Sequence, residues 1–197
     1  SFYSLYPGNW SIKIGDYGDL TPGKSIEDTY KNLSSIVSFF IKNDVIPVVI
    51  GGSQDLTYAN YRAYDEFKKT INIVNVDSNF DLGDSSKPIK NNSYLGKIIL
   101  DEPHNLFNYA TLGYQTYYNP QIEIDLMEKL FFEAYRLGEV CNDITSVEPV
   151  MRDADIVTID LRCIKSSELS SRQKLSPNGF DGKEICSISR YAGISNK

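Results

Sequence analysis

Three short apolar runs divide the sequence and indicate where a β-sheet forms. They cover residues 45–50, 71–76 and 156–159, and each is rich in β-branched residues and too short for a comfortable helix. Their apolar character is mostly continuous rather than alternating, which is typical of strands buried on both faces of a parallel sheet. We therefore predict three strands, the first of which has a special or edge position because it contains Pro47.

The stretches between these runs have the apolar spacing of amphipathic helices. Ser25 followed by Asp28 predicts a capped helix that runs to about residue 42. A second helix is predicted at about residues 56–69, and the clearest pattern predicts a third at about residues 124–137. Strands that alternate with helices indicate an α/β fold class with a mainly parallel sheet.

Composition narrows the class of protein. The chain has 197 residues, of which 41% are hydrophobic, so it is long enough for one domain with a sizeable core. A net charge of -6 without long runs of like charge gives no electrostatic footprint for nucleic acid. No apolar run approaches the roughly 18 residues that span a bilayer, and the three cysteines are widely spaced without a paired motif. We expect a cytoplasmic protein that binds neither nucleic acid nor membrane.

Aspartates follow each of the three predicted strands. Asp55 comes after the first strand, Asp77 and Asp81 after the second, and Asp160 after the third. Because the carboxyl ends of parallel strands meet at one edge of a sheet, these side chains are expected to converge there. Like charges that converge repel one another unless a cation joins them, which predicts a metal site or a salt bridge. The alternative is that the aspartates only cap helices or form turns.

The same three segments carry the resemblance to a known family. Residues 47–55 (PVVIGGSQD), 75–82 (NVDSNFDL) and 158–162 (TIDLR) resemble, in order and spacing, the metal-binding motifs of the ureohydrolases. That family comprises arginase, agmatinase and formiminoglutamase, and its motifs are Gly-Gly-Asp-His-Ser, Asp-Ala-His-x-Asp and Asp-x-Asp. The resemblance covers about residues 10–193 and is strongest to a bacterial formiminoglutamase-like branch. It implies a three-layer α/β/α, arginase-like domain over residues 1–197 that lacks terminal segments of the full family domain.

The resemblance also implies a chemistry, and this chain departs from it. In the family, two manganese ions activate a bridging water that attacks a guanidinium or amidine carbon. Asp77, Asp81 and Asp160 match the family's metal-ligand positions, whereas Gln54 and Asn79 stand where it has histidines. Arg162 replaces the second aspartate of the third motif. A guanidinium cannot ligate a metal, and an amide ligates only weakly.

Arg162 suggests how the retained aspartates are neutralised. Its guanidinium is expected to lie among Asp77, Asp81 and Asp160 and to act as a counter-ion in place of the metal, through charge-assisted hydrogen bonds. The cofactor expectation is therefore no metal, or a weakly bound divalent ion such as magnesium. Manganese is expected if the protein is an active enzyme.

A competing motif lies near the start of the chain. Residues 18–25 (GDLTPGKS) match the spacing of a phosphate-binding P-loop, in which Lys24 and Ser25 would contact a nucleotide. Pro22 has no N–H group to offer a phosphate, and Asp16 and Asp19 would repel one. We interpret the match as chance beside a capped helix, and nucleotide binding remains the rival function from another class.

Three further features have two interpretations each. His104 is a general base or a loop residue, and Cys163 is a thiol activated by Arg162 or a buried inert one. The aromatic stretch at residues 106–118 lines a ligand pocket or subunit interface, or forms a strand at the edge of the core. A homo-oligomer is accordingly one expectation.

Two functional classes follow from these residues. The first is a metal-dependent hydrolase of a linear amidine or guanidine, such as formiminoglutamate, with the metal held by Asp77, Asp81 and Asp160. The second is a non-catalytic descendant, a pseudoenzyme, that binds a small amidine or guanidine ligand or a protein partner through the old pocket. The substitutions at Gln54 and Arg162 favour the second class.

Overall fold

A parallel sheet forms the centre of the computed structural model, which describes residues 13–84, 86–169 and 176–195. Within these residues the strands are ordered β3-β2-β1-β4, and every neighbouring pair is parallel. The bounds are β1 (Ile71–Val76), β2 (Leu106–Tyr114), β3 (Glu133–Arg136) and β4 (Ile156–Ile159). The predicted strands at residues 71–76 and 156–159 are confirmed. The predicted domain boundaries at residues 1 and 197 lie outside the described residues.

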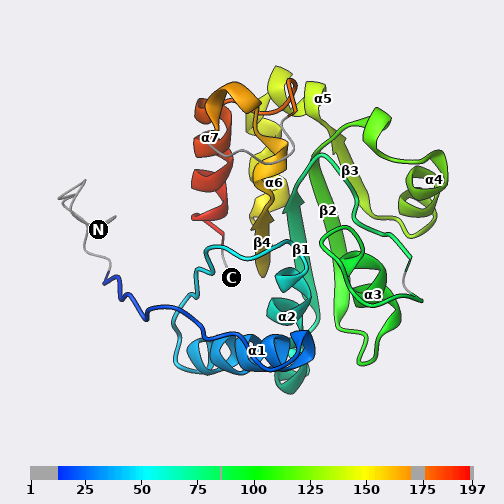
Figure 1. Ribbon diagram of the computed structural model, residues 1–197. Coiled ribbons are helices and arrows are strands. Elements are labelled where there is room, and N and C mark those ends of the chain that lie inside the picture. Colours follow the sequence, from blue (N-terminus) through cyan, green and yellow to red (C-terminus); the bar gives the residue numbers. More distant parts are fainter. Residues whose placement is uncertain (1–12, 85, 170–175, 196–197) are drawn as a thin grey trace.

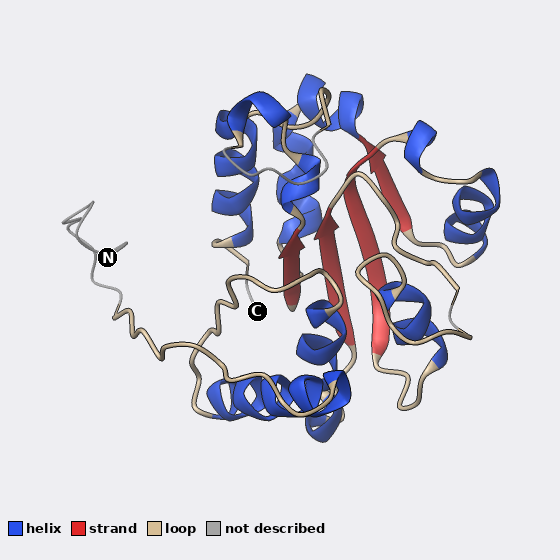
Figure 2. Cartoon of the chain, viewed as in Figure 1, coloured by secondary structure: helices blue, strands red, loops and turns tan. Residues whose placement is uncertain are grey.

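Helices cover both faces of this sheet (Figures 1 and 2). Their bounds are α1 (Ile26–Lys42), α2 (Leu56–Arg62), α3 (Tyr94–Leu100), α4 (Gln121–Lys129), α5 (Leu137–Asn142), α6 (Val147–Met151) and α7 (Gly182–Ala192). Short 3-10 helices lie at Asp65–Phe67, Thr116–Tyr118, Ile144–Ser146, Leu161–Cys163 and Ser166–Glu168. Together these elements confirm the three-layer α/β/α class.

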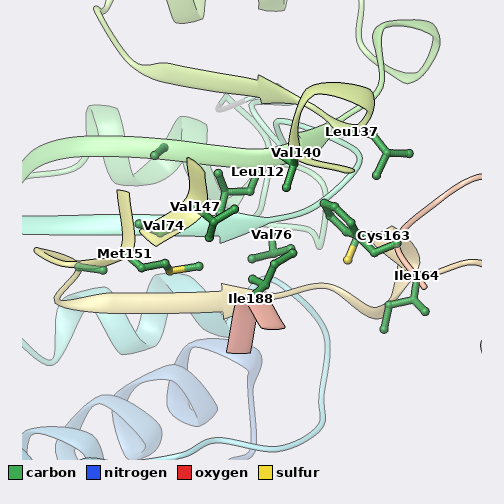
Figure 3. Packing of buried hydrophobic residues seen from close by; sticks show 13 residues of the cluster. Val74, Val76, Leu112, Leu137, Val140, Val147, Met151, Cys163, Ile164 and Ile188 are labelled. Atoms are coloured by element: carbon green, nitrogen blue, oxygen red, sulfur yellow. The ribbon is translucent and has the colours of Figure 1, made fainter. Parts of the chain in front are cut away.

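Alternation of side chains along the strands divides the core into two layers. On one face, Val74 and Val76 of β1 and Leu112 of β2 pack against α5, α6 and α7, which contribute residues such as Val147 and Ile188 (Figure 3). On the opposite face, side chains of β1 and β2 pack against α2, α3 and α4. The sheet is thus buried on both sides, which accounts for the continuous apolar character of β1.

The first helix forms as its sequence pattern predicts. The Ser25 hydroxyl accepts a hydrogen bond from the Asp28 backbone N–H at 3.1 Å, and the Asp28 carboxylate accepts one from the Ser25 N–H at 3.2 Å. This reciprocal capping box satisfies two N–H groups that the helix itself cannot pair. The buried stripe of α1, which includes Leu33 and Val37, packs on Ala59 of α2.

The predicted strand at residues 45–50 is wrong. These residues form an extended loop, in which Ile46 is 83% exposed and Ile50 is 87% exposed. The edges of β1 are both occupied, one by β2 and the other by β4. Within the described residues the run also pairs with neither outer strand, β3 or β4, and a strand without a partner leaves its backbone groups unpaired.

Two predicted helices are shorter than their patterns suggest. The helix expected at residues 56–69 ends at Arg62, and the left-handed backbone of Lys68 (φ 49°) prevents any helix from continuing through residue 69. The helix expected at residues 124–137 ends at Lys129, and Phe131 is also left-handed (φ 57°). Residues 133–136 instead pair with β2 as strand β3, so pairing with a distant segment overrides the helical pattern.

Candidate functional site

Two aspartates lie side by side where β1 and β4 end. Asp77 directly follows Val76, Asp160 directly follows Ile159, and the sheet register pairs Val76 with Ile159. The ladder continues one step further, because the Asp160 backbone N–H donates to the Val76 carbonyl at 3.0 Å. The position of both carboxylates therefore follows from the parallel pairing of the strands.

A third aspartate reaches the same place from the loop after β1. Asp81 has a left-handed backbone (φ 56°), a conformation that few residues other than glycine adopt. Its carbonyl accepts a hydrogen bond from the Leu95 N–H of α3 at 3.2 Å, which helps to hold the turn. The Asp81 side chain is fully buried.

The guanidinium of Arg162 lies among the three carboxylates. Its Nη2 atom is 2.6 Å from Asp160 Oδ2, 3.4 Å from Asp77 Oδ2 and 3.5 Å from Asp81 Oδ2. The side chain of Arg162 is only 28% exposed, while those of Asp77 and Asp81 are completely buried. The Asp160 carboxylate also accepts hydrogen bonds from the Arg162 Nε at 2.8 Å and from its backbone N–H at 2.7 Å. We call these four residues the Arg162 cluster.

One guanidinium does not fully balance three carboxylates. Burial, followed by the charge of Asp160, raises the pKa of Asp77 to about 6, although Arg162 acts in the opposite direction. Burial and the neighbouring Asp77 raise the pKa of Asp81 well above its usual value. No described N–H or O–H group donates a hydrogen bond to the Asp81 carboxylate. Protonation of the Asp77 or Asp81 carboxyl group therefore relieves part of the remaining repulsion.

The two amides at the family's histidine positions lie outside the Arg162 cluster. Gln54 donates from Nε2 to Thr158 Oγ1 at 2.8 Å and to Asn75 Oδ1 at 3.2 Å, and so bridges β4 and β1. Asn79 donates from Nδ2 to the Tyr118 carbonyl at 3.3 Å. Both amides are therefore held by protein groups.

Asp55 does not join the other aspartates, so that part of the expectation is wrong. It is buried and accepts short hydrogen bonds from the hydroxyl groups of Tyr30 and Ser53. Tyr30 belongs to α1, so Asp55 connects the start of α2 to that helix instead of facing the end of β1. Its carboxylate is satisfied by Tyr30 and Ser53 and makes no side-chain cap hydrogen bond to α2.

In the P-loop-like segment, the Ser25 hydroxyl and the Gly23 N–H group are already used in contacts within the protein. The Ser25 side chain caps α1, and the Gly23 backbone N–H donates to Thr29 Oγ1 at 2.9 Å. These contacts support the interpretation of a chance match next to a capped helix. Lys24 is exposed and takes no part in the cap.

The remaining reactive side chains also have structural explanations. His104 is exposed in the loop before β2. Cys163 is buried, and burial raises the pKa of its thiol well above the usual value, so it is an inert thiol rather than an activated one. The aromatic stretch at residues 106–118 forms β2 and a 3-10 helix, which places most of it inside the sheet and not at its edge.

The interpretation of the aromatic stretch at residues 106–118 as part of a pocket lining is supported, because residues 114–117 line a cavity. A cavity of about 350 Å³ lies where β2 and β3 end, and Arg136, Lys165 and Asn178 are among its lining residues. In the sequence, recognition of residues 133–136 as a strand would have placed Arg136 at this cavity. Because residues 133–136 have a helical pattern, Arg136 was not recognised as a strand-end residue.

Fold and site together define an α/β protein of the ureohydrolase type, with aspartates at the carboxyl ends of adjacent parallel strands. The model of the Arginase family matches residues 3–195, and the chain belongs to that family. Within the described residues, no helix is long and apolar enough to cross a membrane.

Curated relatives and solved structures agree with this assignment. The chain is 24% identical to a formimidoylglutamase of Streptococcus gordonii over 95% of its own length and 61% of that protein, and 24% identical to one of a Geobacillus species over 89% and 57%. The formimidoylglutamase of Bacillus subtilis has a similar fold (TM-score 0.78, 16% identity, 89% and 59% covered). So does a formiminoglutamase of Trypanosoma cruzi solved with manganese (TM-score 0.78, 20% identity, 88% and 61% covered). The chain thus spans about 60% of the length of these relatives.

Two manganese ions do not fit the donors as they are arranged here. A guanidinium occupies the space between Asp77, Asp81 and Asp160, and it has no lone pair to offer a metal. Gln54 and Asn79 offer a metal only amide oxygens, which are weaker ligands than imidazole, and their amide nitrogens donate to protein groups. In the part of the chain that is described, no group of three or more histidine, cysteine or acidic side chains has an arrangement that could hold a metal ion.

Proposed function

We propose that the chain is an arginase-family protein in which the guanidinium of Arg162 takes the place of manganese. On this proposal it has little or no hydrolase activity and acts by binding a small ligand or a protein partner. The observation that supports this most directly is the position of Arg162 Nη2, which is within 3.5 Å of one oxygen from each of Asp77, Asp81 and Asp160.

Electrostatics gives the physical reason. A divalent ion that entered the Arg162 cluster would have to displace a guanidinium that makes charge-assisted hydrogen bonds to Asp160. The displaced guanidinium would also need a new position, and it would leave two wholly buried carboxylates. A metal must therefore compete with an intramolecular cation that is always present and does not lose its proton near neutral pH.

A second candidate is a metal-dependent hydrolase of a linear amidine or guanidine. The names of the curated relatives support it, because the formimidoylglutamase of Streptococcus gordonii matches 95% of this chain. The retained Asp77, Asp81 and Asp160 would then hold manganese after Arg162 swings outward. The partial exposure of the Arg162 side chain leaves a path for that movement.

One experiment separates the two candidates. The protein is loaded with manganese and assayed on arginine, agmatine, guanidinobutyrate and formiminoglutamate, and its metal content is measured by elemental analysis. We expect no turnover and no stoichiometric metal. Two manganese ions per chain, or a turnover that Asp77→Asn abolishes, would overturn the proposal and establish the hydrolase.

A substitution at Arg162 sharpens the test. Arg162→Asp restores the acidic residue of the family motif and removes the intramolecular cation. We expect this variant to retain more manganese than the parent protein does. Arg152→Gln is the matched control, because Arg152 is paired with Glu148 on the surface of α6 and its loss should leave the metal content unchanged. Equal manganese content in the parent and in Arg162→Asp would contradict the counter-ion role.

A further inference from the structure

The turn that follows β1 carries two of the three carboxylates of the Arg162 cluster. The side chains of Asp77 and Asp81, at the two ends of this turn, are completely buried. Residues 78–80 between them belong to no helix or strand, so no regular hydrogen-bond pattern fixes their backbone. Asp81 is also left-handed (φ 56°), a conformation that persists only where the surroundings hold it. The geometry of the cluster therefore depends on contacts that reach the turn from elsewhere.

Asn119, in the loop after β2, supplies two of these contacts. Its Oδ1 accepts a hydrogen bond from the Phe80 N–H at 2.9 Å, and its Nδ2 donates to the Ser78 carbonyl at 2.9 Å. Nδ2 also donates to the Gln115 carbonyl at 2.9 Å, which ties the side chain to its own loop. The two bonded residues of the turn are the direct neighbours of the two aspartates. One side chain thus holds the backbone next to both carboxylates.

Burial makes these hydrogen bonds hard to replace. Asn119 is only 6% exposed, and Phe80 is fully buried against the ring of Tyr114, with ring centroids 4.9 Å apart. A buried N–H group or carbonyl that loses its partner costs free energy, because water does not reach it to form a new bond. Without the Asn119 amide, the turn is therefore expected to move until its backbone groups are satisfied.

The partners of Asn119 require an amide side chain. A carboxamide offers an acceptor and two N–H donors, and here it meets one N–H group and two carbonyls, so all three are used. This pattern also identifies which terminal atom is the nitrogen, since only the nitrogen can face two carbonyls. A carboxylate has no donor for the carbonyls, and an apolar side chain has neither donor nor acceptor.

Backbone contacts join the loop of Asn119 to the sheet. The Asp77 N–H donates to the Leu112 carbonyl of β2 at 3.1 Å, and the Gln115 N–H donates to the Ser78 carbonyl at 3.1 Å. These bonds extend the parallel pairing of β1 and β2 beyond the ends of the two strands. Asn119 therefore acts from a support that is fixed to the sheet.

We infer that Asn119 is the positioning residue of the Arg162 cluster, and that it holds the turn so that Asp77 and Asp81 approach Arg162 Nη2 at 3.4 and 3.5 Å. This role rests on the counter-ion function proposed above. Within the described residues, none of the hydrogen bonds of Asn119 involves a residue of the cluster. Asn119 acts on the guanidinium through the position of the two carboxylates.

A double-mutant cycle in urea tests this role. Arg162→Ala should lower the urea midpoint of the parent protein, because it removes the counter-ion. In an Asn119→Ala background, the same substitution should shift the midpoint by about half as much or less, because the displaced carboxylates no longer meet the guanidinium. Two residues with independent structural roles would instead give equal shifts in both backgrounds.

Asn178→Ala is the matched control. Asn178 also binds the loop after β2 through its amide, which donates to Gln115 Oε1 at 3.2 Å and to the Tyr117 hydroxyl at 3.3 Å. Those bonds do not involve the turn at residues 78–80. Arg162→Ala should therefore shift the midpoint equally in the Asn178→Ala background and in the parent protein.

Amide hydrogen exchange in the native state is a second measurement. The Leu95 N–H donates to the Asp81 carbonyl at 3.2 Å, so its exchange rate reports the position of the turn. Relative to amides of β1, the Leu95 amide should exchange about tenfold faster or more in Asn119→Ala than in the parent protein. Asn119→Asp keeps the size of the side chain and the acceptor for the Phe80 N–H but loses both donors, and it should also speed this exchange. Asn178→Ala should leave it unchanged.

The outcomes separate this inference from the proposed function. Equal Arg162→Ala shifts in the parent and Asn119→Ala backgrounds, or unchanged Leu95 exchange in both Asn119 variants, would overturn the positioning role and leave the counter-ion proposal standing. A parent protein whose urea midpoint does not respond to Arg162→Ala would overturn the counter-ion proposal, and the positioning role with it.

Discussion

Arg162 Nη2 and Asp160 Oδ2 are 2.6 Å apart, and only one residue separates Asp160 from Arg162 in the chain. The Asp160 carboxylate also accepts the Arg162 backbone N–H, so the 3-10 turn at Leu161–Cys163 holds the guanidinium against the end of β4. This local pair directs Arg162 toward Asp77 and Asp81, which come from a different strand end. The counter-ion is therefore positioned by the segment that also carries one of its partners.

Removal of Arg162 should destabilise the protein. Arg162→Ala leaves Asp77 and Asp81 buried without a cation, and breaking a buried ion pair in this way costs roughly 3 to 5 kcal/mol. Proton uptake by the carboxylates should reduce that cost, so we expect a loss of about 2 to 4 kcal/mol in the free energy of unfolding at pH 7. Urea denaturation measures it. Arg152→Ala, which removes an exposed pair, should change the same quantity by less than about 1 kcal/mol.

Manganese provides the second half of this test. Arg162→Ala leaves three carboxylates without their counter-ion. Manganese should therefore raise the urea midpoint of the variant but not that of the parent protein. A variant as stable as the parent without metal would contradict the counter-ion role of Arg162.

Asp77 should make the protein less stable as the pH rises. Its pKa in the folded state is raised to about 6, whereas an unfolded aspartate has a pKa of about 3.9. The folded state therefore holds the proton more tightly, and this contribution to stability is complete below about pH 4 and is lost as the pH rises through about 6. Asp77→Asn keeps the shape and cannot ionise, so it should exceed the parent in unfolding free energy by roughly 1 to 3 kcal/mol at pH 7.5.

The quantity to measure is the difference in unfolding free energy between Asp77→Asn and the parent protein, because other carboxylates titrate in both. Urea denaturation at pH 4 and pH 7.5 should show that the advantage of Asp77→Asn shrinks at the lower pH. If the stability difference is equal at both pH values, or grows as the pH falls, then the pKa of Asp77 is not raised in the folded protein.

The sequence predicted well the site residues that lie at strand ends. Asp77 and Asp160 follow short apolar runs whose parallel pairing brings them together, and Arg162 lies where its charge suggested. Asp55 was misplaced because its own run, residues 45–50, is not a strand, and no local pattern reveals that Tyr30 of α1 binds its carboxylate. Partners that are distant in sequence decided both outcomes.

The wrong prediction of a helix over residues 133–136 also arose from a partner that is distant in sequence, and it concealed the strand-end position of Arg136. Residues 133–136 continue the helical spacing of the residues before them, but Phe131 interrupts the helix and the edge of β2 supplies hydrogen-bond partners. Sequence spacing carries no information about that free edge. Arg136 was consequently not expected at a strand end, so the sequence indicated only the part of the cavity lining that residues 114–117 contribute.

Substitutions of Ser25 and Lys24 distinguish a structural role of the capping box of α1 from nucleotide binding. Ser25→Ala removes the hydroxyl that accepts the Asp28 N–H, and should lower the free energy of unfolding by about 0.5 to 2 kcal/mol. Lys24→Ala should change it by less than about 0.5 kcal/mol, because Lys24 is exposed and outside the cap. Calorimetry with ATP and magnesium should detect no binding to the parent protein. Tight ATP binding that Lys24→Ala abolishes would instead support the P-loop rival.

The three thiols should differ in reactivity in the folded protein. Cys163 is buried at the end of the 3-10 turn that positions Arg162, and burial raises the pKa of its thiol well above the usual range. Cys141 is exposed, but partial burial and the neighbouring Glu184 raise the pKa of its thiol to about 11. Cys186 is exposed on α7. Because the thiolate is the reactive form, a disulfide reagent at pH 8 should modify Cys186 first, Cys141 slowly and Cys163 only after denaturation.

Mass spectrometry of the modified peptides measures this order. In urea all three thiols should react at similar rates, which serves as the control for reagent access. Arg162→Ala should speed the modification of Cys163, because it removes the hydrogen bonds of the guanidinium to Asp160 across the turn that Cys163 ends. Rapid modification of Cys163 in the folded parent protein would mean that the turn is open in solution, and the Arg162 cluster would then lack the rigid support that holds its cation in place.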